Sequence, residues 1–452
     1  MCRWSVLAKG ATLSWVAVCT DNRRLMSTAS LCGISCVTSS HSRRIILRSG
    51  SNQVTERRVY LDHAATSWPK PPGVLEACLE FQRDLGVAAS RGAYLRGEQT
   101  DRAIAQVRSK LSRFLHLDDA YRVAWTSNGT MAIHAAIHSV LWQTDLRGEH
   151  VVTTATEHNS VLRTLADLQE RRGLRWTMVP CDARGWVDPD AIEQAICSDT
   201  KLVIVNHASN VTGVVQDLER IGRIVANSEA WWMLDAAQSI GYVDFDPRSL
   251  GIDLVVAPAH KGLGGMFGTA FVVAASEVVP SLRSPWVGGT GRSSGTWTGP
   301  FEWLESVESG NLNGPSIASL GAALLSASTR SMADFQAKAS DWLSRLRHQI
   351  ARYASLRLVG YPDGPEDLQQ VSRVPVLSFS SRTLGSHEMA MLLDSAMGLE
   401  CRSGLHCAGA IHPFLGTDPQ DGTLRMSFGH ATSEADVDAA IQGIRLLGEV
   451  NA

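Results

Sequence analysis

The stretch VVAPAHKGLGGMFGTAFVV, residues 255–273, decides the fold. An apolar run leads into a histidine and a lysine, a glycine-rich turn follows, and a second apolar run begins near residue 270. Short apolar runs bounded by glycine or proline are typical of buried strands. The sequence therefore predicts a strand, a turn and a second strand, with Lys261 at the rim of a sheet.

The chain before this stretch alternates short apolar runs with helical patterns. The runs that read as strands are RVAWTS (122–127), HVVTTA (150–155), LRWTMVP (174–180), KLVIVNHA (201–208), WWMLDAA (231–237) and DLVVAPA (253–259). Helical patterns fall at residues 132–143, 161–172, 188–196 and 217–228. Such alternation predicts an α/β fold with a mainly parallel sheet covered on both faces, and ligands that bind at the carboxyl ends of the strands.

Two charged side chains follow predicted strands. Lys261 follows one strand, and Asp235 lies at the end of another, in WWMLDAAQS (231–239). Burial lowers the pKa of a lysine, so that its amine can form a Schiff base. A buried carboxylate needs a cationic partner, and the protonated ring nitrogen of pyridoxal phosphate is one. On these segments alone, Lys261 could equally be a surface lysine, and Asp235 could cap the next helix.

Three further segments place polar residues after strands. Gln238 and Asn210 carry amides that could contact the ring oxygen of such a cofactor, and His158 carries an imidazole that could stack on the ring. Gly129, in TSNGTMAIHAA (126–136), lies where a strand meets a helix, and helix N-terminal amides bind phosphate. Each of these residues alone would more often be a turn residue, so the prediction rests on their combination.

Ten motifs in a fixed order resemble those of a known family. They are LDHAATSWPKP, TSNGT, TEHNS, NHASNVTG, LDAAQ, AHKGLGG, GGTG, ESGNLN, RSGLHCA and LRMSFGHATSE. The chain is similar to the class V aminotransferase family of fold-type I pyridoxal-phosphate enzymes, and within it to the cysteine desulfurase and selenocysteine lyase branch. This resemblance runs from about residue 59 to the C-terminal helix. It implies a large domain with a mainly parallel seven-stranded sheet and a smaller α+β C-terminal domain.

The resemblance implies how pyridoxal 5'-phosphate would be bound. Lys261 would hold it as a Schiff base and later move protons, while Asp235 would pair with the pyridinium nitrogen. The other implied contacts are Gln238 and Asn210 to the ring oxygen, His158 stacked on the ring, and Gly129, Thr130 and His260 to the phosphate. The motifs depart from the family pattern at Asn128, where a glycine is usual, and at Pro258, where a serine or threonine often contacts phosphate.

The resemblance also implies a homodimer and a substrate site. Gly289 and Thr290 would reach the phosphate of the neighbouring subunit. Arg425 would bind the substrate carboxylate, a task suited to the planar guanidinium. Ala64 and Ala65 would line the substrate pocket.

Cys407 lies in RSGLHCAGAIH (402–412), between Gly404 and Gly409. A lone cysteine can be a small buried hydrophobic residue, but the motif implies a mobile nucleophile. We expect Cys407, Lys261 and His158 to be catalytic, converting L-cysteine to L-alanine while the sulfur passes to Cys407 as a persulfide. Arg402 and His406 are near in sequence, and either side chain could face the thiol.

The predicted function is therefore that of a pyridoxal-phosphate-dependent cysteine desulfurase, with a sulfur-acceptor protein as its partner. The alternatives are a selenocysteine lyase or another class V enzyme, namely an aminotransferase, an epimerase or a different β-lyase. Cys407 argues against an aminotransferase, because transamination requires no thiol, while cysteine and selenocysteine both stay open as substrates. A non-catalytic dimer that serves as a scaffold would be expected to have lost Lys261, Asp235 or Arg425, and all three are present.

The composition argues against several other classes. The 452 residues carry a net charge of −3, which gives no electrostatic footprint for nucleic acid or an anionic membrane. No apolar run reaches bilayer length. The nine cysteines match no zinc pattern and are too sparse for a disulfide scaffold, so we predict no metal and a reducing compartment, the cytoplasm.

Residues 1–55 differ from the rest, because they are rich in Ser, Arg and Cys and contain Asp21 as their only acidic residue. They resemble a transit peptide, which would place the protein in a mitochondrion or plastid, or they reflect an over-extended gene start, with Met26 as one possible true start. We predict a poorly ordered extension over 1–55, an N-terminal arm and cofactor-binding domain over 56–300, and a small domain over 301–452.

Overall fold

The computed structural model describes residues 58–89, 94–117, 119–289, 297, 302–361 and 371–450 with their side chains, and four earlier strands by their backbone. The chain divides into two units, Met1–Arg57 with Ala452, and Arg58–Asn451. In the first unit, a four-stranded antiparallel sheet has the order β1-β2-β4-β3. Its strands are β1 (Arg3–Lys9), β2 (Thr12–Val18), β3 (Cys36–Ser39) and β4 (Ser42–Leu47). The second unit carries all ten motifs.

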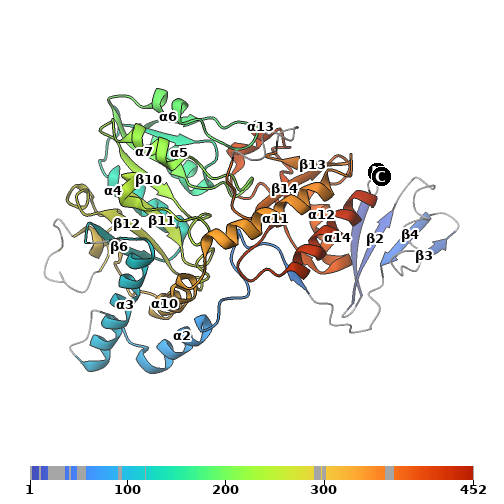
Figure 1. The fold of residues 1–452 in the computed structure, drawn as a ribbon, viewed down its shortest axis with the longest axis horizontal. Helices are drawn as coiled ribbons and strands as arrows, with labels where there is room; N and C mark the ends of the chain where they lie inside the picture. Colours follow the sequence, from blue (N-terminus) through green and yellow to red (C-terminus); the bar gives the residue numbers. More distant parts are fainter. Residues whose placement is uncertain are drawn as a thin grey trace. The chain divides into compact units, whose positions relative to one another are not determined.

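The second unit contains a seven-stranded sheet in the order β6-β12-β11-β10-β9-β7-β8. Figure 1 labels β6, β12, β11 and β10 of this sheet. Its strands are β6 (Tyr121–Thr126), β7 (His150–Thr154), β8 (Arg175–Val179), β9 (Thr200–Asn206), β10 (Trp231–Asp235), β11 (Leu254–Pro258) and β12 (Ala270–Ala275). The pairs from β11 across to β8 are parallel, whereas β12 is antiparallel to β11 and to β6. The prediction of a mainly parallel sheet is confirmed, and so are all six strands that were predicted to precede Lys261 in the chain.

The reversal at β12 has a simple cause. The connection from Ala259 to Thr269 contains no helix, and a parallel crossover needs a dozen or more residues, usually a helix. The chain therefore turns straight back along β11. This keeps Lys261 at the carboxyl edge of the sheet.

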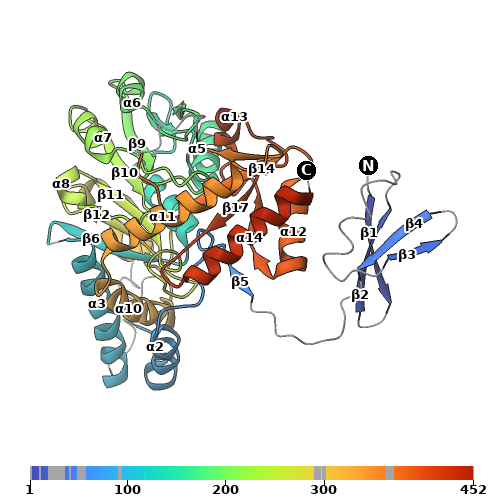
Figure 2. The same ribbon diagram turned by 45° about the vertical axis from the view of Figure 1, so that its right-hand side comes forward.

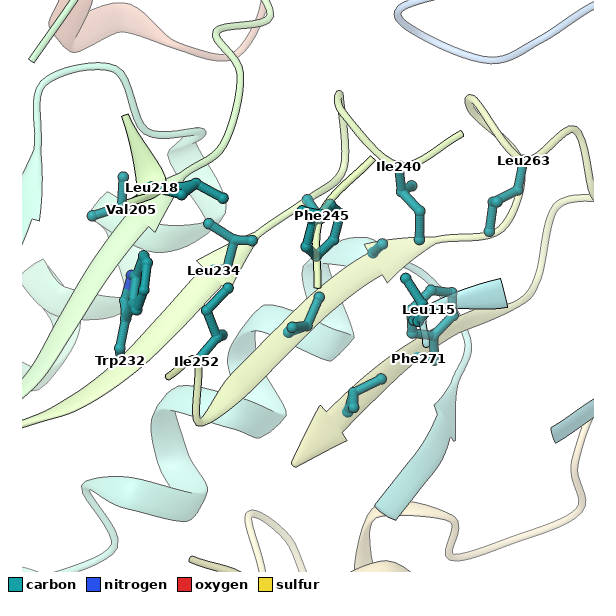
Figure 3. Close-up of a cluster of buried hydrophobic side chains, with 14 of the residues drawn as sticks. Leu115, Val205, Leu218, Trp232, Leu234, Ile240, Phe245, Ile252, Leu263 and Phe271 are labelled. Atoms are coloured by element: carbon teal, nitrogen blue, oxygen red, sulfur yellow. The ribbon is translucent and has the colours of Figure 1, made fainter. Parts of the chain in front are cut away.

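Side chains alternate along the central strands, so the two faces of the sheet bury different residues. In β10, Trp232 and Leu234 belong to one buried cluster, and Met233 belongs to the other. Figure 3 shows Trp232 and Leu234 in the first cluster together with Leu218 and Phe271. The helices α4 (Gly129–Val140) and α5 (Asn159–Arg172) contribute to the second cluster.

The helices of this region begin where the sequence places capping side chains. A side chain accepts a backbone N–H bond at the start of α4, α5, α6 (Pro189–Ala195) and α7 (Leu218–Val225), and these caps are Asn128, His158, Asp188 and Asp217. Such caps satisfy amides that have no partner within the helix. The four helices predicted between the strands are confirmed. Among the described residues, no helix combines the length and apolar character of a membrane span.

A second, antiparallel sheet has the order β13-β14-β17-β16. Its strands are β13 (Leu356–Val359), β14 (Val376–Ser381), β16 (Arg402–Gly404) and β17 (Thr423–Ser427). Three helices pack with it, α11 (Met332–Ile350), α12 (Ser386–Met397) and α14 (Glu434–Val450), and α11 and α14 lie side by side in Figure 2. The chain from Val59 contributes β5 (Val59–Tyr60), which pairs with β15 (Leu399–Glu400). The predicted smaller α+β region is confirmed.

The helix α10 (Gly314–Ser328) packs against α2 (Val74–Glu80) and α3 (Leu95–Phe114), although it follows residue 300 in the chain. Glycines allow the close approach. A Cβ at Gly314 would lie 2.4 Å from the ring of Phe81, and one at Gly321 would lie 2.8 Å from Val107. The domain limits at residues 55 and 300 stay predictions.

Candidate active site

A pocket opens at the carboxyl ends of β6, β7, β9, β10 and β11. This is where an α/β sheet of this type binds ligands. The side chains lining it come from five loops that follow strands of the sheet. They are Asn128, Gly129, Thr130, Ile133, His158, Ser160, Asn206, Ala208, Asn210, Asp235, Ala237, Gln238, Pro258, His260 and Lys261. Eight of the residues that the sequence singled out as cofactor contacts therefore line one cavity.

Lys261 lies in the turn between β11 and β12. Burial lowers the pKa of its amine from 10.5 to about 8, and the Asp235 carboxylate opposes the shift. The turn needs Gly262, because a Cβ there would lie 2.1 Å from the carbonyl oxygen of Ile240. Gly264 adopts the left-handed backbone conformation, with φ of 85°. Lys261 is thus a desolvated amine held in a closely packed turn.

Asp235 ends β10 inside the pocket and is only 5% exposed. Its Oδ1 accepts a hydrogen bond from the Ala237 amide at 2.9 Å. Burial raises the pKa of the carboxyl, and the nearby Lys261 amine opposes this. A carboxylate in this position favours a cationic group in the pocket.

Glu157 is a buried acid that the sequence analysis missed. Its Oε1 accepts hydrogen bonds from Thr154 Oγ1 and from the Asn206 amide, both at 2.8 Å. Burial, followed by the charge of Asp235, raises the pKa of Glu157 to about 8. The acid is therefore largely protonated at neutral pH, which leaves the Asp235 charge without a second anion beside it.

One end of the pocket suits an anion. Gly129 and Thr130 open α4, and the Asn128 side chain caps it by accepting from the Met131 amide at 2.9 Å. Nδ1 of His260 is buried and has no hydrogen-bond partner among the described residues. Helix amides and an unsatisfied imidazole can both donate to a phosphate.

His158 caps α5 through Nδ1, which accepts from the Ser160 amide at 3.1 Å. Burial and then the charge of Lys261 lower the pKa of His158 to about 4. The imidazole is therefore neutral at physiological pH. A neutral ring fixed by a cap is suited to stacking on a planar ligand.

The two amides expected at a ring oxygen lie in the pocket, but each donates to a backbone carbonyl. Asn210 Nδ2 donates to the His406 carbonyl at 2.6 Å, and Gln238 Nε2 donates to the Ala64 carbonyl at 3.0 Å. Each amide nitrogen carries two hydrogens, so one remains for a ligand. The Asn210 contact also ties the pocket to the Cys407 loop.

Arg425, on β17, is only 1% exposed. Its Nη2 forms an ion pair with Asp62 at 2.6 Å, and its Nη1 donates to the Asn210 carbonyl at 3.1 Å. Nε is buried and has no partner among the described residues. The guanidinium is thus oriented by two contacts and keeps donors for an anion. The partner Asp62 was not foreseen.

Ala64 and Ala65 lie beside Asp62 in the segment that follows β5. Ser427 Oγ accepts from the Ala64 amide at 2.9 Å, and the Asp62 carbonyl accepts from the Ala65 amide at 3.0 Å. The two alanines do not line the main pocket itself. They lie next to the ion pair of Arg425.

Cys407 is exposed, and its neighbour in space is Arg402. Nη2 of Arg402 lies 3.4 Å from the Cys407 sulfur. His406 is instead 3% exposed, and its Nε2 contacts Thr423 Oγ1 at 2.8 Å. The question that the sequence left open is therefore answered, because the arginine faces the thiol and the histidine does not.

The Cys407 loop is attached to the pocket through its backbone. The Cys407 carbonyl accepts from the Asn159 amide at 2.7 Å, directly after His158. His406 and Cys407 both have positive φ, 53° and 59°, which is uncommon for residues other than glycine. Cys407 also lies within electrostatic range of Lys261 and Arg425.

Gly289 is described, and its carbonyl accepts from the Gly310 amide at 2.9 Å. It does not line the pocket of its own chain. Thr290 lies outside the described residues. Within the described ranges, no group of three or more His, Cys, Asp or Glu residues is arranged to hold a metal.

Comparison with known proteins identifies the family. A sequence model described as Aminotransferase class-V matches residues 59–440, and the chain belongs to that family. A probable cysteine desulfurase of Methanothermobacter thermautotrophicus is 30% identical over 393 residues, which cover 86% of this chain and 93% of the relative. The cysteine desulfurase IscS of Clostridium botulinum is 28% identical over 397 residues, covering 85% and 93%.

Solved structures agree with this assignment. An apo structure of a cysteine desulfurase from Thermococcus onnurineus has a TM-score of 0.78 and 25% identity, with 87% of this chain and 95% of that chain covered. The cysteine desulfurase CsdA of Escherichia coli shares the fold, with a TM-score of 0.75 and 24% identity over 87% and 96%. The predicted fold-type I architecture is confirmed.

Proposed function

We propose that this chain is a pyridoxal-phosphate-dependent cysteine desulfurase, which converts L-cysteine to L-alanine and receives the sulfur on Cys407. The observation that carries the proposal is the placement of Cys407. An exposed thiol with a guanidinium at its sulfur lies on a loop attached to the edge of the Lys261 pocket. Transamination needs no such thiol. The names of the relatives support the same activity.

The pocket residues fit pyridoxal phosphate. The unsatisfied His260 nitrogen and the start of α4 would hold the phosphate, and Asp235 would pair with the ring nitrogen. His158 would stack on the ring, and Lys261 would bind the cofactor covalently. The cofactor, when bound, supplies an electron sink for charge that develops at the substrate Cα.

Arg425 would bind the substrate carboxylate through the donors that Asp62 and Asn210 leave available. Lys261 would take and return the Cα proton at Nζ, since a pKa of about 8 keeps both of its protonation states accessible near neutral pH. These two side chains orient the substrate and move its proton.

Cys407 would act after the Cα proton has been removed. Its sulfur would form a bond with the substrate sulfur while the bond between the substrate Cβ and that sulfur breaks. The electron pair of the broken bond stays with Cβ, which is protonated to give alanine, and the transferred sulfur becomes the terminal atom of a persulfide. The Arg402 guanidinium, at 3.4 Å, would lie beside the attacking sulfur.

We also propose a homodimer, in which Gly289 and Thr290 would reach the partner's phosphate site. Large apolar side chains on and near α2 and α10 are more than half exposed, a surface that a second copy would cover. They are Trp68, Leu75, Leu79, Phe267 and Leu325. A sulfur-acceptor protein would then collect the sulfur from the exposed Cys407 loop. The cytoplasmic location stays a prediction.

The test uses mass spectrometry of the full chain after incubation with pyridoxal phosphate and L-cysteine. One sulfur atom should be added at Cys407, and Cys407→Ala should lose both this adduct and the release of sulfide with reductant. Cys197→Ala is the matched control, because Cys197 is another exposed free thiol, and this variant should behave like the wild type. Undiminished alanine and sulfide formation by Cys407→Ala would refute the proposal. Parallel assays with L-selenocysteine would identify a selenocysteine lyase.

A further inference from the structure

One backbone carbonyl beside Lys261 accepts an unusual number of contacts. The His260 carbonyl oxygen lies 3.0 Å from the Ser67 amide, 3.2 Å from Ser67 Oγ, 3.1 Å from Thr66 Oγ1 and 3.1 Å from Lys70 Nζ. All of these donors come from the single segment that follows β5. This carbonyl belongs to the peptide bond that joins His260 to Lys261.

Lys70 is the one charged donor in this group. Its ammonium also lies 3.3 Å from Thr66 Oγ1, 3.4 Å from Ser67 Oγ and 5.4 Å from the centre of the Phe267 ring. Among the described residues, no carboxylate contributes to the electrostatics of the Lys70 amine. Burial lowers the pKa of Lys70 to about 8. A cation that is partly removed from water with only neutral partners is costly, so its contact with the His260 carbonyl calls for an explanation.

The contact restricts the turn that carries Lys261. The same turn is closed from within by the Gly264 amide, which donates to the Lys261 carbonyl at 2.8 Å, and by the Gly265 amide, which donates to the Ala259 carbonyl at 2.8 Å. Fixing the His260 carbonyl from outside sets the plane of the peptide before Lys261. The direction in which the Lys261 side chain leaves the backbone is then set as well.

We propose that Lys70 is a positioning residue, which holds the His260–Lys261 peptide so that the Lys261 amine points into the pocket. The importance assigned here to Lys261 rests on the proposed function. The Lys70 contact also connects this turn to exposed apolar side chains. Trp68, two residues before Lys70, and Phe267, whose ring the Lys70 ammonium contacts, are each more than half exposed. A second copy that covers these rings would further confine the lysine.

Hydrogen exchange of the full chain, with and without added pyridoxal phosphate, tests whether Lys70 holds the His260–Lys261 peptide in place. In Lys70→Met the amides of Gly264 and Gly265 should exchange about tenfold faster without cofactor, while those of β9 and β10 keep the wild-type rate. The control is Lys201→Met, because Lys201 is an exposed lysine of β9, and this variant should match the wild type throughout. Unchanged exchange in the turn, or an equal increase across the whole sheet, would overturn the proposal.

A second measurement tests whether the contact of Lys70 with the His260 carbonyl affects cofactor binding. The dissociation constant of pyridoxal phosphate, followed by its absorbance, should rise at least fivefold in Lys70→Met and should not change in Lys201→Met. An unchanged constant would refute the positioning role. Neither readout depends on the conversion of L-cysteine, so failure of the proposed activity would be recognised separately.

Discussion

The substitution Lys261→Met tests whether the structure describes the pocket correctly, without any assay of catalysis. Methionine keeps an unbranched side chain up to the ε position and removes the buried amine. In the cofactor-free chain, burial lowers the pKa of Lys261 from 10.5 to about 8. A lysine whose pKa is lowered on folding destabilises the folded state while the pH is below about 8. This cost disappears as the pH rises toward 10.5, because the unfolded chain then loses its proton too.

The size of this cost in stability follows from the shift in the pKa of Lys261. At pH 7 the cost is about 3 kcal/mol, and at pH 9.5 it has fallen to about 1 kcal/mol. The stability gained by Lys261→Met over the wild type should therefore shrink by about 2 kcal/mol between these two pH values. The Lys70 amine, also with a pKa of about 8, titrates in both chains and cancels in the difference.

Urea denaturation of the cofactor-free chains at pH 7, 8 and 9.5 would measure this difference. Lys201→Met is again the control, because it removes an exposed lysine that lies outside the pocket. If the gain in the free energy of unfolding of Lys261→Met over the wild type stays constant or grows with pH, the reasoning that places a desolvated amine in this pocket is refuted.

Three other substitutions test separate contacts. Arg402→Met removes the guanidinium that lies 3.4 Å from the Cys407 sulfur. Alkylation of Cys407 by iodoacetamide should slow about tenfold, because the sulfur loses one charge-assisted contact. An unchanged rate would show that the contact does not activate the thiol. Asp62→Asn leaves the buried Arg425 without its counter-charge and should lower the free energy of unfolding by about 3 kcal/mol and raise the KM for L-cysteine more than it lowers kcat. Unaltered stability would exclude the ion pair. Asp235→Asn should weaken binding of pyridoxal phosphate at least tenfold in an absorbance titration, and wild-type affinity would remove Asp235 from the site.

Much of the fold was predictable because burial leaves a periodic signal. The apolar runs from residue 121 to 258 are the strands of the large sheet, and the polar residues that end them are the lining of the pocket. Asp235 and Lys261 could be assigned to one cavity because parallel strands bring their carboxyl ends to one edge. Local pattern and topology were sufficient for that inference.

Contacts between distant parts of the chain left no such signal. Asp62 and Arg425 are 363 positions apart, and Lys70 contacts a carbonyl 190 positions away. Glu157 was visible in TEHNS, but nothing in the residues around it indicated that its carboxyl would be buried beside Asp235. Whether Arg402 or His406 faces Cys407 also depended on the three-dimensional path of the loop, because both residues are near Cys407 in sequence.

The left-handed backbone at His406 and Cys407 has a consequence for how sulfur could leave the protein. Each non-glycine residue in this conformation costs about 1–2 kcal/mol. That energy opposes the contacts that attach the loop to Asn159, Asn210 and Thr423. The strain therefore lowers the energy needed to move this loop away from the pocket. A loop that takes up sulfur at the pocket and releases it at the protein surface works best when neither of its two positions is much more stable than the other.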